Sequence, residues 1–252
     1  MVRAISRTLD VFLIFVGECI LLLLEAIRKA FRQPTEWRET LAQMAFVGVA
    51  SLPIVLLTSF FSGAVLCFYL SRFLGHFEIK TFVGATVGLS AVKEIIPILT
   101  GTTVAARCGS AMAAQIGTMA VTEQIDALKM LSVNPTKYLV TPRIVASMLM
   151  MPALCLGGIY CCLGGAYLIA INSGIPAGTF ISSIQQYTSP ADLARGVLKT
   201  PVFGLIIALV ACQQGLRTKD GAVGVGKATT NAVVVSIVLI YIADFLIATY
   251  SP

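Results

Sequence analysis

The sequence predicts an all-α integral membrane protein with five transmembrane helices, on the basis of its composition and its five long apolar runs. Hydrophobic residues occupy 57% of the 252 positions, charged residues 12%, and the mean hydropathy is +0.90. Soluble domains carry roughly 25% charged residues. A spanning helix needs about 20 mostly apolar residues. The runs that reach this length are 44–70, 81–117, 139–171, 197–216 and 228–250.

These runs account for one membrane domain over residues 1–252, with the five-span bundle at 44–250. All seven cysteines fall inside or beside apolar runs, where free cysteine behaves as a small hydrophobe. We therefore expect no disulfide framework and no metal site. His76 is the single histidine and lies in a predicted loop, which argues against histidine-based catalysis. The net charge of +6 suits anionic lipid headgroups, and nothing indicates a nucleic-acid partner.

The distribution of positive charge predicts a cytoplasmic N-terminus and a C-terminus on the opposite side, because Lys and Arg accumulate on the cytoplasmic flanks of spans. Thirteen of the 18 precede the first span, surround the segment between the second and third spans, or flank the last span. The opposite loops are predicted to hold Arg72, Lys80, Arg195 and Lys199, and Lys93 lies inside an apolar run. The thirteen are Arg3, Arg7, Arg28, Lys29, Arg32, Arg38, Arg107, Lys129, Lys137, Arg143, Arg217, Lys219 and Lys227.

Residues 1–38 predict an amphipathic helix and a turn that lie in the membrane interface. At about 100° per residue, the charged side chains of this helix fall within one arc, and the rest of its surface is apolar. A spanning helix would bring the acidic members of this stripe into hydrocarbon, whereas a helix in the headgroup plane keeps them hydrated. We favour the interfacial helix over a sixth span. The stripe comprises Arg3, Arg7, Asp10, Glu18, Glu25, Arg28, Lys29 and Arg32.

The second apolar run carries small residues at every fourth position. Helices in lipid associate by close backbone approach, so a face of small residues predicts tight helix packing. The sequence leaves open whether the contact is made with another helix of this chain or with a second copy. The ladder consists of Gly101, Ala105, Gly109, Ala113 and Gly117.

Lys93 and Glu94 in the second apolar run, and Asp244 in the last, place ionisable groups at membrane depth. Such groups usually face a cavity, a partner or a hydrated path. Pro97 follows three residues after Glu94 and removes a backbone donor from the helix. Two interpretations remain open for these residues: a structural ion pair at the outer end of a tilted helix, or the polar lining of a substrate cavity.

Two polar stretches between the spans are interpreted as loops. Residues 172–196, NSGIPAGTFISSIQQYTSPADLARG, predict a solvated outer hairpin, with a lid over a cavity as the alternative. The stretch GAVGVGKAT at 221–229 resembles a phosphate-binding loop, but that motif needs a hydroxyl after the lysine and a strand before the loop. Ala228 follows Lys227, and a membrane span precedes the loop. We expect no nucleotide site there.

A short acidic segment lies between the second and third spans, GTMAVTEQIDALKMLSVNP at 117–135. It predicts a helix at about 120–132 on the cytoplasmic surface. Thr122 is positioned to cap this helix, and acidic residues in its first turn suit the positive end of the helix dipole. Asn134 and Pro135 end it.

The same helix combines an apolar ridge with an acidic pair. Val121, Ile125 and Leu128 share one side at helical spacing, and Glu123 and Asp126 lie on another. A membrane span would not tolerate the acids, and a solvated loop would not need the ridge. The combination favours a helix that docks into a groove on a separate protein. A helix packed only on its own spans is the alternative.

The segment VKEIIPILTGTTVAARCGSAMAAQIGTMAVTEQIDALKMLSVNPTKYLVTPR at 92–143 resembles the MlaE/YrbE permeases, the membrane subunits of ABC transporters that move lipids together with MCE proteins. The resemblance continues through GKATTNAVV at 226–234 to the acidic residue of the last span, so it covers nearly the whole chain. The combination of GTMAVTEQIDAL, a following Asn-Pro turn and Pro-Arg is highly specific.

The resemblance implies a single permease domain that forms a homodimer and binds two cytoplasmic ABC ATPase subunits, beneath periplasmic MCE-domain proteins. It implies that ATP and Mg²⁺ bind to the partner and that this chain carries no cofactor and no catalytic residue. The charged pair of the family's lipid cavity corresponds to Lys93 and Glu94, and we assign Pro97 and Asp244 to the same cavity. The coupling helix that contacts the ATPase corresponds to Thr122, Glu123, Gln124, Ile125, Asp126, Ala127 and Leu128.

Some positions depart from the family pattern. The family usually has Arg before the cavity Glu, and Lys93 cannot make the bidentate phosphate contact of Arg. Ser132 and Asn134 replace the common Gly and Asp after the coupling helix, and Ala42 or Gln43 replaces a basic residue early in the first span. These changes concern headgroup contact and lipid selectivity rather than coupling.

The sequence therefore predicts a non-catalytic permease subunit that moves phospholipid or a related lipid between the inner membrane and a periplasmic MCE protein or the outer membrane. Because no chloroplast-type transit segment precedes residue 1, we expect a multi-pass protein of a bacterial inner membrane with a periplasmic C-terminus. A stand-alone secondary transporter or channel is the alternative, but it would be expected to show internal repeats and more polar residues in the membrane. An intramembrane enzyme would need a nucleophile with a base beside it.

Overall fold

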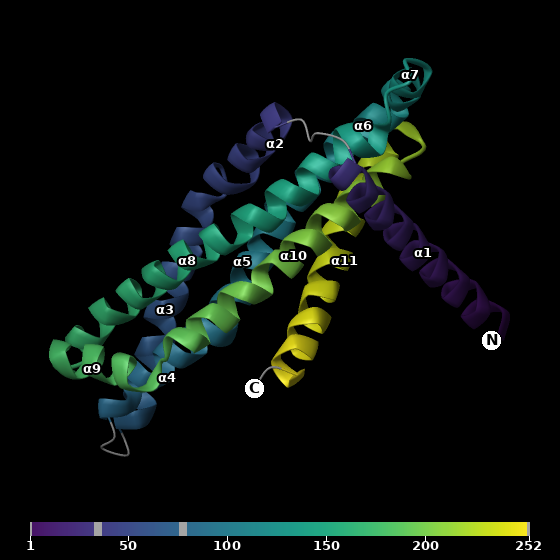
Figure 1. Ribbon diagram of the computed structural model, residues 1–252. Coiled ribbons are helices and arrows are strands. Elements are labelled where there is room, and N and C mark those ends of the chain that lie inside the picture. The colour runs from purple at the N-terminus through teal and green to yellow at the C-terminus, as the bar shows by residue number, and fades with distance from the viewer. Residues whose placement is uncertain (1, 33–36, 76–79, 251–252) are drawn as a thin grey trace.

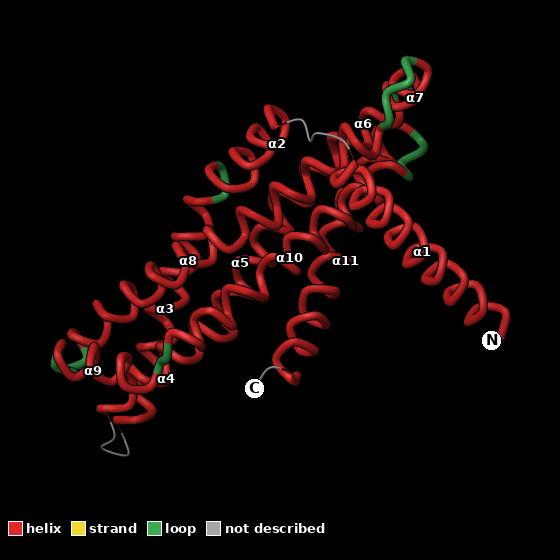
Figure 2. The backbone as a smooth tube through the Cα atoms, in the orientation of Figure 1, coloured by secondary structure: helices red, strands yellow, loops and turns green. Residues whose placement is uncertain are grey.

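The computed structural model describes residues 2–32, 37–75 and 80–250, with side chains at 13–28, 37–75 and 81–250. Over these residues the chain is helical, with short connecting loops and no strand (Figure 2). The described residues contain five helical segments that are long and apolar enough to cross a membrane, which confirms the predicted spans. The loop residue His76 and the predicted turn at 33–36 lie outside the described residues. The spans are Trp37–Gly75, Val83–Val121, Thr136–Asn172, Pro190–Leu216 and Gly221–Tyr250.

Several spans are built from more than one helix, joined by π-helical turns. The chain begins with α1 (Val2–Arg32), and the first span holds α2 (Trp37–Met44), the π-helical turn η1 (Ala45–Val49) and α3 (Leu52–Gly75). The 3₁₀ turn η2 (Lys80–Phe82) leads into the second span, which holds α4 (Val83–Ser90), η3 (Ala91–Ile95), α5 (Ile96–Val104), η4 (Ala105–Gly109) and α6 (Ser110–Val121). The remaining elements are α7 (Gln124–Met130), η5 (Thr136–Val140), α8 (Thr141–Asn172), α9 (Ala177–Tyr187), α10 (Pro190–Leu216) and α11 (Gly221–Tyr250).

The long helix α8 runs alongside both α3 and α10, as Figure 1 shows. Helix α7 projects from one end of this bundle, here called the α7 end, and α4 and α9 lie at the other, here called the α9 end. The largest core cluster includes Met112, Met151, Leu154, Phe203 and Ile207, which come from three different spans. This core holds the second, third and fourth spans together.

The ladder of small residues lies against helices of the same chain. A Cβ on Gly101 would lie 3.3 Å from the ring of Phe203 on α10, and a Cβ on Gly109 would lie 3.4 Å from Ile207 on the same helix. The question that the sequence left open is thus answered for these positions, because the second span approaches α10 of its own chain. Ala105, Ala113 and Gly117, the remaining members, are also buried.

The segment predicted as a solvated outer hairpin is partly helical, so that prediction was wrong in its extent. Residues 177–187 form α9, and α10 begins at Pro190, well before the predicted start at 197. The hydroxyl of Ser189 accepts a hydrogen bond from the backbone N–H of Asp192, and the Asp192 carboxylate accepts one from the backbone N–H of Ser189. This reciprocal capping box fixes the start of α10.

Arg107 was predicted to mark the cytoplasmic flank, but it lies inside the second span, in η4. Its Nη1 atom donates to the carbonyl of Phe46, at 3.2 Å, and to the hydroxyl of Ser51, at 3.0 Å. Its guanidinium also lies over the ring of Phe46. The side chain therefore serves the junction between η1 and η4, where two π-helical turns meet.

Helix α1 leaves the bundle at the α7 end and diverges from the direction of the spans (Figure 1). It is not among the five segments that qualify as spans. Its placement in the membrane interface stays a prediction, and the side chains of Arg3, Arg7, Asp10, Lys29 and Arg32 lie outside the described residues.

Candidate functional site

The second span departs from α-helical geometry at the predicted polar site. Residues 91–95 form the π-helical turn η3, and Pro97 follows in the first turn of α5. Proline has no backbone N–H, so the carbonyl four residues before it, that of Lys93, loses its usual donor. The ammonium of Lys199 donates to this carbonyl instead, at 3.2 Å. Turns of this kind are frequent at functional sites.

Lys199 joins three spans through a cluster of charged side chains. Its Nζ lies 2.8 Å from Glu94 Oε1 on η3 and 3.1 Å from Asp244 Oδ1 on α11. The Lys199 side chain is 6% exposed and that of Asp244 is 8% exposed, whereas that of Glu94 is 42% exposed. One buried ammonium therefore faces two carboxylates, and the Glu94 carboxylate is the part of the cluster that a ligand can reach.

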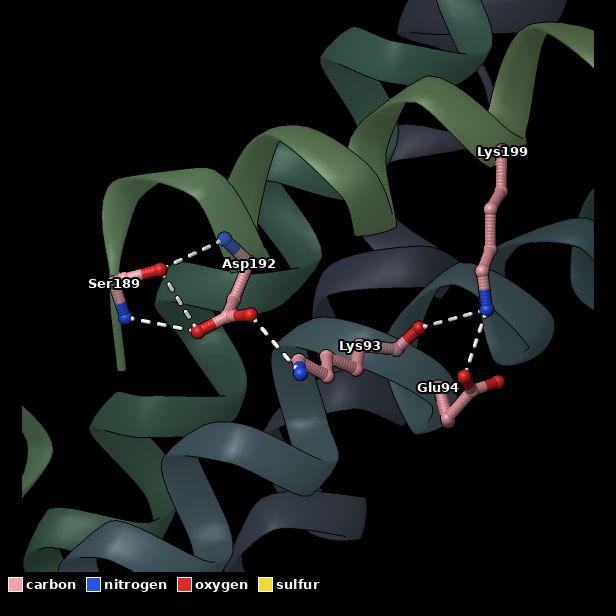
Figure 3. Close-up of polar contacts among 5 residues, drawn as sticks. All are labelled: Lys93, Glu94, Ser189, Asp192 and Lys199. Carbon is pink, nitrogen blue, oxygen red and sulfur yellow. Dashed lines mark hydrogen bonds and ion pairs between the residues drawn. The ribbon is translucent and has the colours of Figure 1, made fainter. Parts of the chain in front are cut away.

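Lys93, the neighbour of Glu94 on η3, forms a separate ion pair with α10. Its Nζ lies 3.0 Å from Asp192 Oδ1, in the first turn of α10, and Ser189 holds the carboxylate of Asp192 through its hydroxyl and its backbone N–H. Figure 3 shows Lys93 pointing toward Asp192, while Lys199 reaches from α10 to Glu94 and to the Lys93 carbonyl. Adjacent residues of η3 thus contact two different sites on α10.

The structure brings together the four predicted cavity residues and adds two that the sequence interpretation missed. Lys93 and Glu94 do not pair with each other; each contacts α10, and Asp244 is connected to Glu94 through Lys199. Placing Lys199 in an outer loop was wrong, because α10 starts earlier than its apolar run and buries this side chain. The capping residues Ser189 and Asp192 were the sequence signal that α10 starts at Pro190. Asp192 itself was also missed as a site residue.

An apolar groove of about 590 Å³ lies beside the ion cluster, between η3 and α3. Ile95, the neighbour of Glu94, forms part of its wall. The α3 residues that line it span positions 57 to 69, which is about 18 Å of helix at 1.5 Å per residue. The groove is long and apolar enough for a lipid acyl chain. Its α3 lining consists of Leu57, Thr58, Phe61, Ser62, Val65, Leu66 and Tyr69.

Helix α7 is bounded by two residues with left-handed backbone conformation, Glu123 with φ 58° and Ser132 with φ 60°. Thr122 was predicted to cap α7, but this was wrong. Its hydroxyl donates to the carbonyl of Thr118, at 2.8 Å, so it serves the end of α6. Glu123 precedes α7 and makes no side-chain capping bond. The chain therefore turns sharply between α6 and α7 rather than continuing as one helix.

The apolar ridge of α7 faces the chain itself. Ile125 is 7% exposed and belongs to a buried cluster with Ile116 and Val140, and Leu128 packs against the same cluster. The prediction that this ridge lies in a partner's groove was therefore wrong, because the ridge already covers the end of the bundle. The other predicted coupling residues, Glu123, Gln124, Asp126 and Ala127, are exposed, as is Thr122.

A different apolar surface of α7 is exposed. Met130 at its last position is 86% exposed, and Leu131 immediately after it is 74% exposed. Asp126 and Lys129 form an ion pair of 2.8 Å beside them, with both side chains largely exposed. The outward surface of α7 thus combines an apolar tip with charged neighbours. The sequence interpretation missed Met130 and Leu131 because the helical spacing favoured the ridge that is buried.

Comparison with known proteins identifies the family. The family model described as Permease MlaE matches residues 40–250. A probable ABC transporter permease protein of Rickettsia bellii (strain RML369-C) is 40% identical over 233 residues, which cover 92% of this chain and 90% of the relative. A probable ABC transporter permease protein of Synechocystis is 42% identical over 216 residues, with 84% and 81% covered.

A third relative comes from a plant. The protein TRIGALACTOSYLDIACYLGLYCEROL 1, chloroplastic, of Arabidopsis thaliana is 36% identical over 230 residues, which cover 90% of this chain and 65% of the relative. The matched region of the family model spans the ion cluster, the groove and α7 together. With its five apolar spans and this match over most of its length, the chain belongs to the MlaE family of membrane permeases.

Proposed function

We propose that the chain is the non-catalytic membrane subunit of an ABC transporter that moves phospholipid or a related lipid between the inner membrane and a periplasmic MCE protein or the outer membrane. The observation that carries this proposal is the course of the second span. This span holds Glu94 toward the α9 end, and at its other end a sharp turn at Thr122 and Glu123 joins it to α7 (Figure 1). In the proposed function, a movement of α7 reaches the ion cluster through this span.

The chemistry of the α9 end supports a lipid as the substrate. Lys93 and Glu94 offer a cation and a carboxylate to the charged groups of a headgroup, and both side chains are about one-third or more exposed. The neighbouring groove is apolar and follows α3, so it suits an acyl chain. The name of the Arabidopsis relative refers to a glycerolipid, which agrees with this substrate class.

The outward surface of α7 supports a partner that supplies the energy. It presents Glu123, Asp126, Met130 and Leu131 to the surroundings, and an apolar tip with charged neighbours suits a protein–protein contact. The partner is a cytoplasmic ABC ATPase subunit that binds ATP and Mg²⁺. In this arrangement the α7 end and the N-terminus are cytoplasmic. The α9 end faces periplasmic MCE proteins, and two copies of the chain form a homodimer.

Copurification tests the energy source. A tagged chain expressed in its native membrane and extracted in mild detergent is expected to bring down a nucleotide-binding subunit with ATPase activity. Isolation of the chain without such a subunit, while it transports lipid alone in vesicles, would support the stand-alone transporter instead.

Photocrosslinking in the purified complex tests the substrate. Lys93→Ala together with Glu94→Ala is expected to lower labelling of the chain by a photoactivatable phospholipid. Lys227→Ala, which removes an exposed lysine on α11, is the control and is expected to leave labelling unchanged. Equal labelling of all three proteins would assign Lys93 and Glu94 to structure alone.

A further inference from the structure

Helix α1 is attached to the rest of the chain through two carboxylates that lie two helical turns apart. Glu18 Oε2 accepts a hydrogen bond from Gln213 Nε2, at 2.8 Å, and lies 3.4 Å from Arg217 Nε; both partners lie at the C-terminal end of α10. Glu25 contacts a different element. A separation of seven residues places both carboxylates on the same face of α1.

Glu25 binds the segment through which the chain leaves α7. Its Oε1 accepts a hydrogen bond from Asn134 Nδ2, at 3.2 Å, and its Oε2 accepts one from the hydroxyl of Thr136, at 3.0 Å. The side-chain oxygen of Asn134 in turn accepts from the backbone N–H of Lys137, at 3.2 Å. Hydrogen bonds to an ionised carboxylate are stronger than those between neutral groups. The start of η5 is thereby tied to α1.

The face of α1 opposite its buried residues Cys19 and Ala26 is apolar and exposed, which suits contact with lipid. Cys19 and Ala26 are turned toward the bundle, and Glu18 and Glu25 lie at the edge of that buried face. An apolar face of this kind is typical of a helix that lies in the membrane interface. The exposed residues on this face are Leu13, Ile14, Ile20, Leu21, Leu24 and Ile27, with exposed fractions between 46% and 68%.

On its exit side, α7 is closed by backbone hydrogen bonds from Ser132 and Val133 to the carbonyls of Lys129 and Leu128. The helix is seven residues long and is bounded by the left-handed residues Glu123 and Ser132. This conformation is unfavourable for residues with a side chain and persists only where the surrounding structure holds it. On the entry side Thr122 bonds to α6, and Ile125 is buried. On the exit side the contacts of Glu25 with Asn134 and Thr136 supply the corresponding attachment.

We propose that Glu25 is a positioning residue that ties the exit of α7 to a helix held in the membrane, so that a displacement of α7 enters the second span instead of tilting α7 by itself. The proposal rests on the proposed function, in which a partner ATPase pushes on α7, and on the predicted placement of α1 in the membrane interface. Glu25 does not line the lipid groove and is not part of the ion cluster, and the role proposed for it runs through the loop that follows α7.

Two variants separate this role from a general attachment of α1. Glu25→Ala removes both bonds to the α7 exit, and Glu18→Ala, the matched control, removes a carboxylate of α1 that contacts only α10 among these elements. Glu25→Gln keeps one accepting oxygen and serves as the conservative variant. Thr136→Val removes a single hydroxyl with little change of shape.

Hydrogen exchange on the full chain in nanodiscs measures the attachment without any ATPase. Loss of two bonds to a charged group is expected to raise exchange at residues 131–137 about ten-fold in Glu25→Ala, and to leave it at the wild-type rate in Glu18→Ala. Unchanged exchange in Glu25→Ala would show that Glu25 does not hold this loop. This result is independent of whether α7 binds an ATPase.

The complex with its ATPase, reconstituted in vesicles of phosphatidylethanolamine and phosphatidylglycerol, measures the coupling. Glu25→Ala is expected to keep the ATPase bound and hydrolysing ATP while the lipid moved per ATP falls several-fold, and Glu25→Gln should restore part of that ratio. In the double variant Glu25→Ala with Thr136→Val, the two losses should not add, because both remove the same contact. A normal ratio in Glu25→Ala despite faster exchange would overturn the positioning role, whereas absence of any bound ATPase in the wild type would count against the proposed function only.

Discussion

At the scale of single residues, Lys199 has the largest structural role in the candidate site. Its ammonium lies within hydrogen-bonding distance of two carboxylates and one backbone carbonyl, and these belong to the second and fifth spans. A buried charge is tolerated where opposite charges and hydrogen bonds surround it. Lys199 therefore links α10 to both neighbouring spans, and its loss leaves Asp244 buried without its cation.

Replacing Lys199 with methionine is expected to destabilise the protein strongly. Removing one partner of a buried ion pair typically costs about 3–5 kcal/mol, and this loss should appear as a lower melting temperature of the purified protein in detergent. Lys199→Met combined with Asp244→Asn removes both charges of the buried pair and should recover much of the loss.

The same substitution at an exposed ion pair provides the control. Lys129 pairs with Asp126 on α7, where both side chains are more than half exposed, and such pairs contribute at most about 1 kcal/mol. Lys129→Met is therefore expected to melt close to the wild type. Equal melting of the two single variants would contradict the role assigned to Lys199.

At the scale of elements, the contact between α10 and η3 depends on a close approach of backbones at Gly196. A Cβ at this position would overlap the backbone carbonyl oxygen of Val92, next to Lys93. The two elements could then no longer approach closely enough to preserve the contacts of Lys199 with Glu94 and with the Lys93 carbonyl. Glycine at this position thus allows the ion cluster to form.

Gly196→Ala is expected to lower stability by about 1–3 kcal/mol, because the added methyl group forces the backbones apart. Lipid transport should fall in the same variant. Gly164→Ala on α8 is the matched control, because a Cβ there meets no atom within 4 Å, and helical Gly→Ala is favourable by roughly 0.5–1 kcal/mol. Thermal unfolding of both purified variants checks the prediction, and a drop in both would point to a general effect of the substitution.

The tip of α7 is expected to contribute to partner binding and not to stability. Met130→Ser together with Leu131→Ser changes two side chains that are mostly exposed, so the melting temperature should stay near the wild-type value. Recovery of the ATPase with the tagged chain should fall about ten-fold or more, as expected for an apolar contact at the centre of an interface. Glu123→Lys is expected to weaken the same assembly.

Ile125→Ser tests the other side of α7. Ile125 is buried in the chain's own core, so this variant should lower the melting temperature. If the Met130 and Leu131 variant lost stability instead and still bound the ATPase, the assignment of the two sides of α7 would be reversed.

The sequence predicted the five spans of this fold well, but it missed α9 and placed the start of α10 too late. Apolar runs identified all five spans, because the membrane demands about 20 apolar residues for each. The start of α10 was missed because its first turns are polar and outside the apolar run, although the capping residues Ser189 and Asp192 mark it. The side of α7 that faces outward was missed because periodicity groups Ile125 with Leu128 but does not say what covers them.

Only part of the candidate site could be predicted from the sequence, because its residues stand out only where they interrupt an apolar run. Lys93, Glu94 and Asp244 are conspicuous as charges in apolar runs, whereas their shared partner Lys199 lies near the polar start of a span and was assigned to a loop. The pairing itself depends on how three helices approach one another, and one sequence does not contain that information. The sequence also did not predict the π-helical turn η3, although Pro97 indicated an irregular hydrogen-bond pattern.

At the scale of the whole molecule, the proposal requires that α7 and α9 lie on opposite sides of the membrane. Ser132→Cys after α7 and Ser182→Cys on α9 introduce thiols at exposed positions, whereas the native cysteines are buried or half-buried. In intact cells a membrane-impermeant maleimide is expected to label the α9 position only. Labelling of the α7 position should appear after permeabilisation, and its labelling in intact cells would reverse the proposed topology.

The π-helical turn η4 sits in the middle of the ladder of small residues. A repeat of four residues drifts around an α-helix by about 40° per step, since the α-helix completes a turn in 3.6 residues. The wider turn at 105–109 offsets part of this drift, and Gly101 before it and Gly109 at its end both face α10. The extra width of this turn therefore lets a repeat of four residues keep facing α10, which the period of an α-helix alone would not allow.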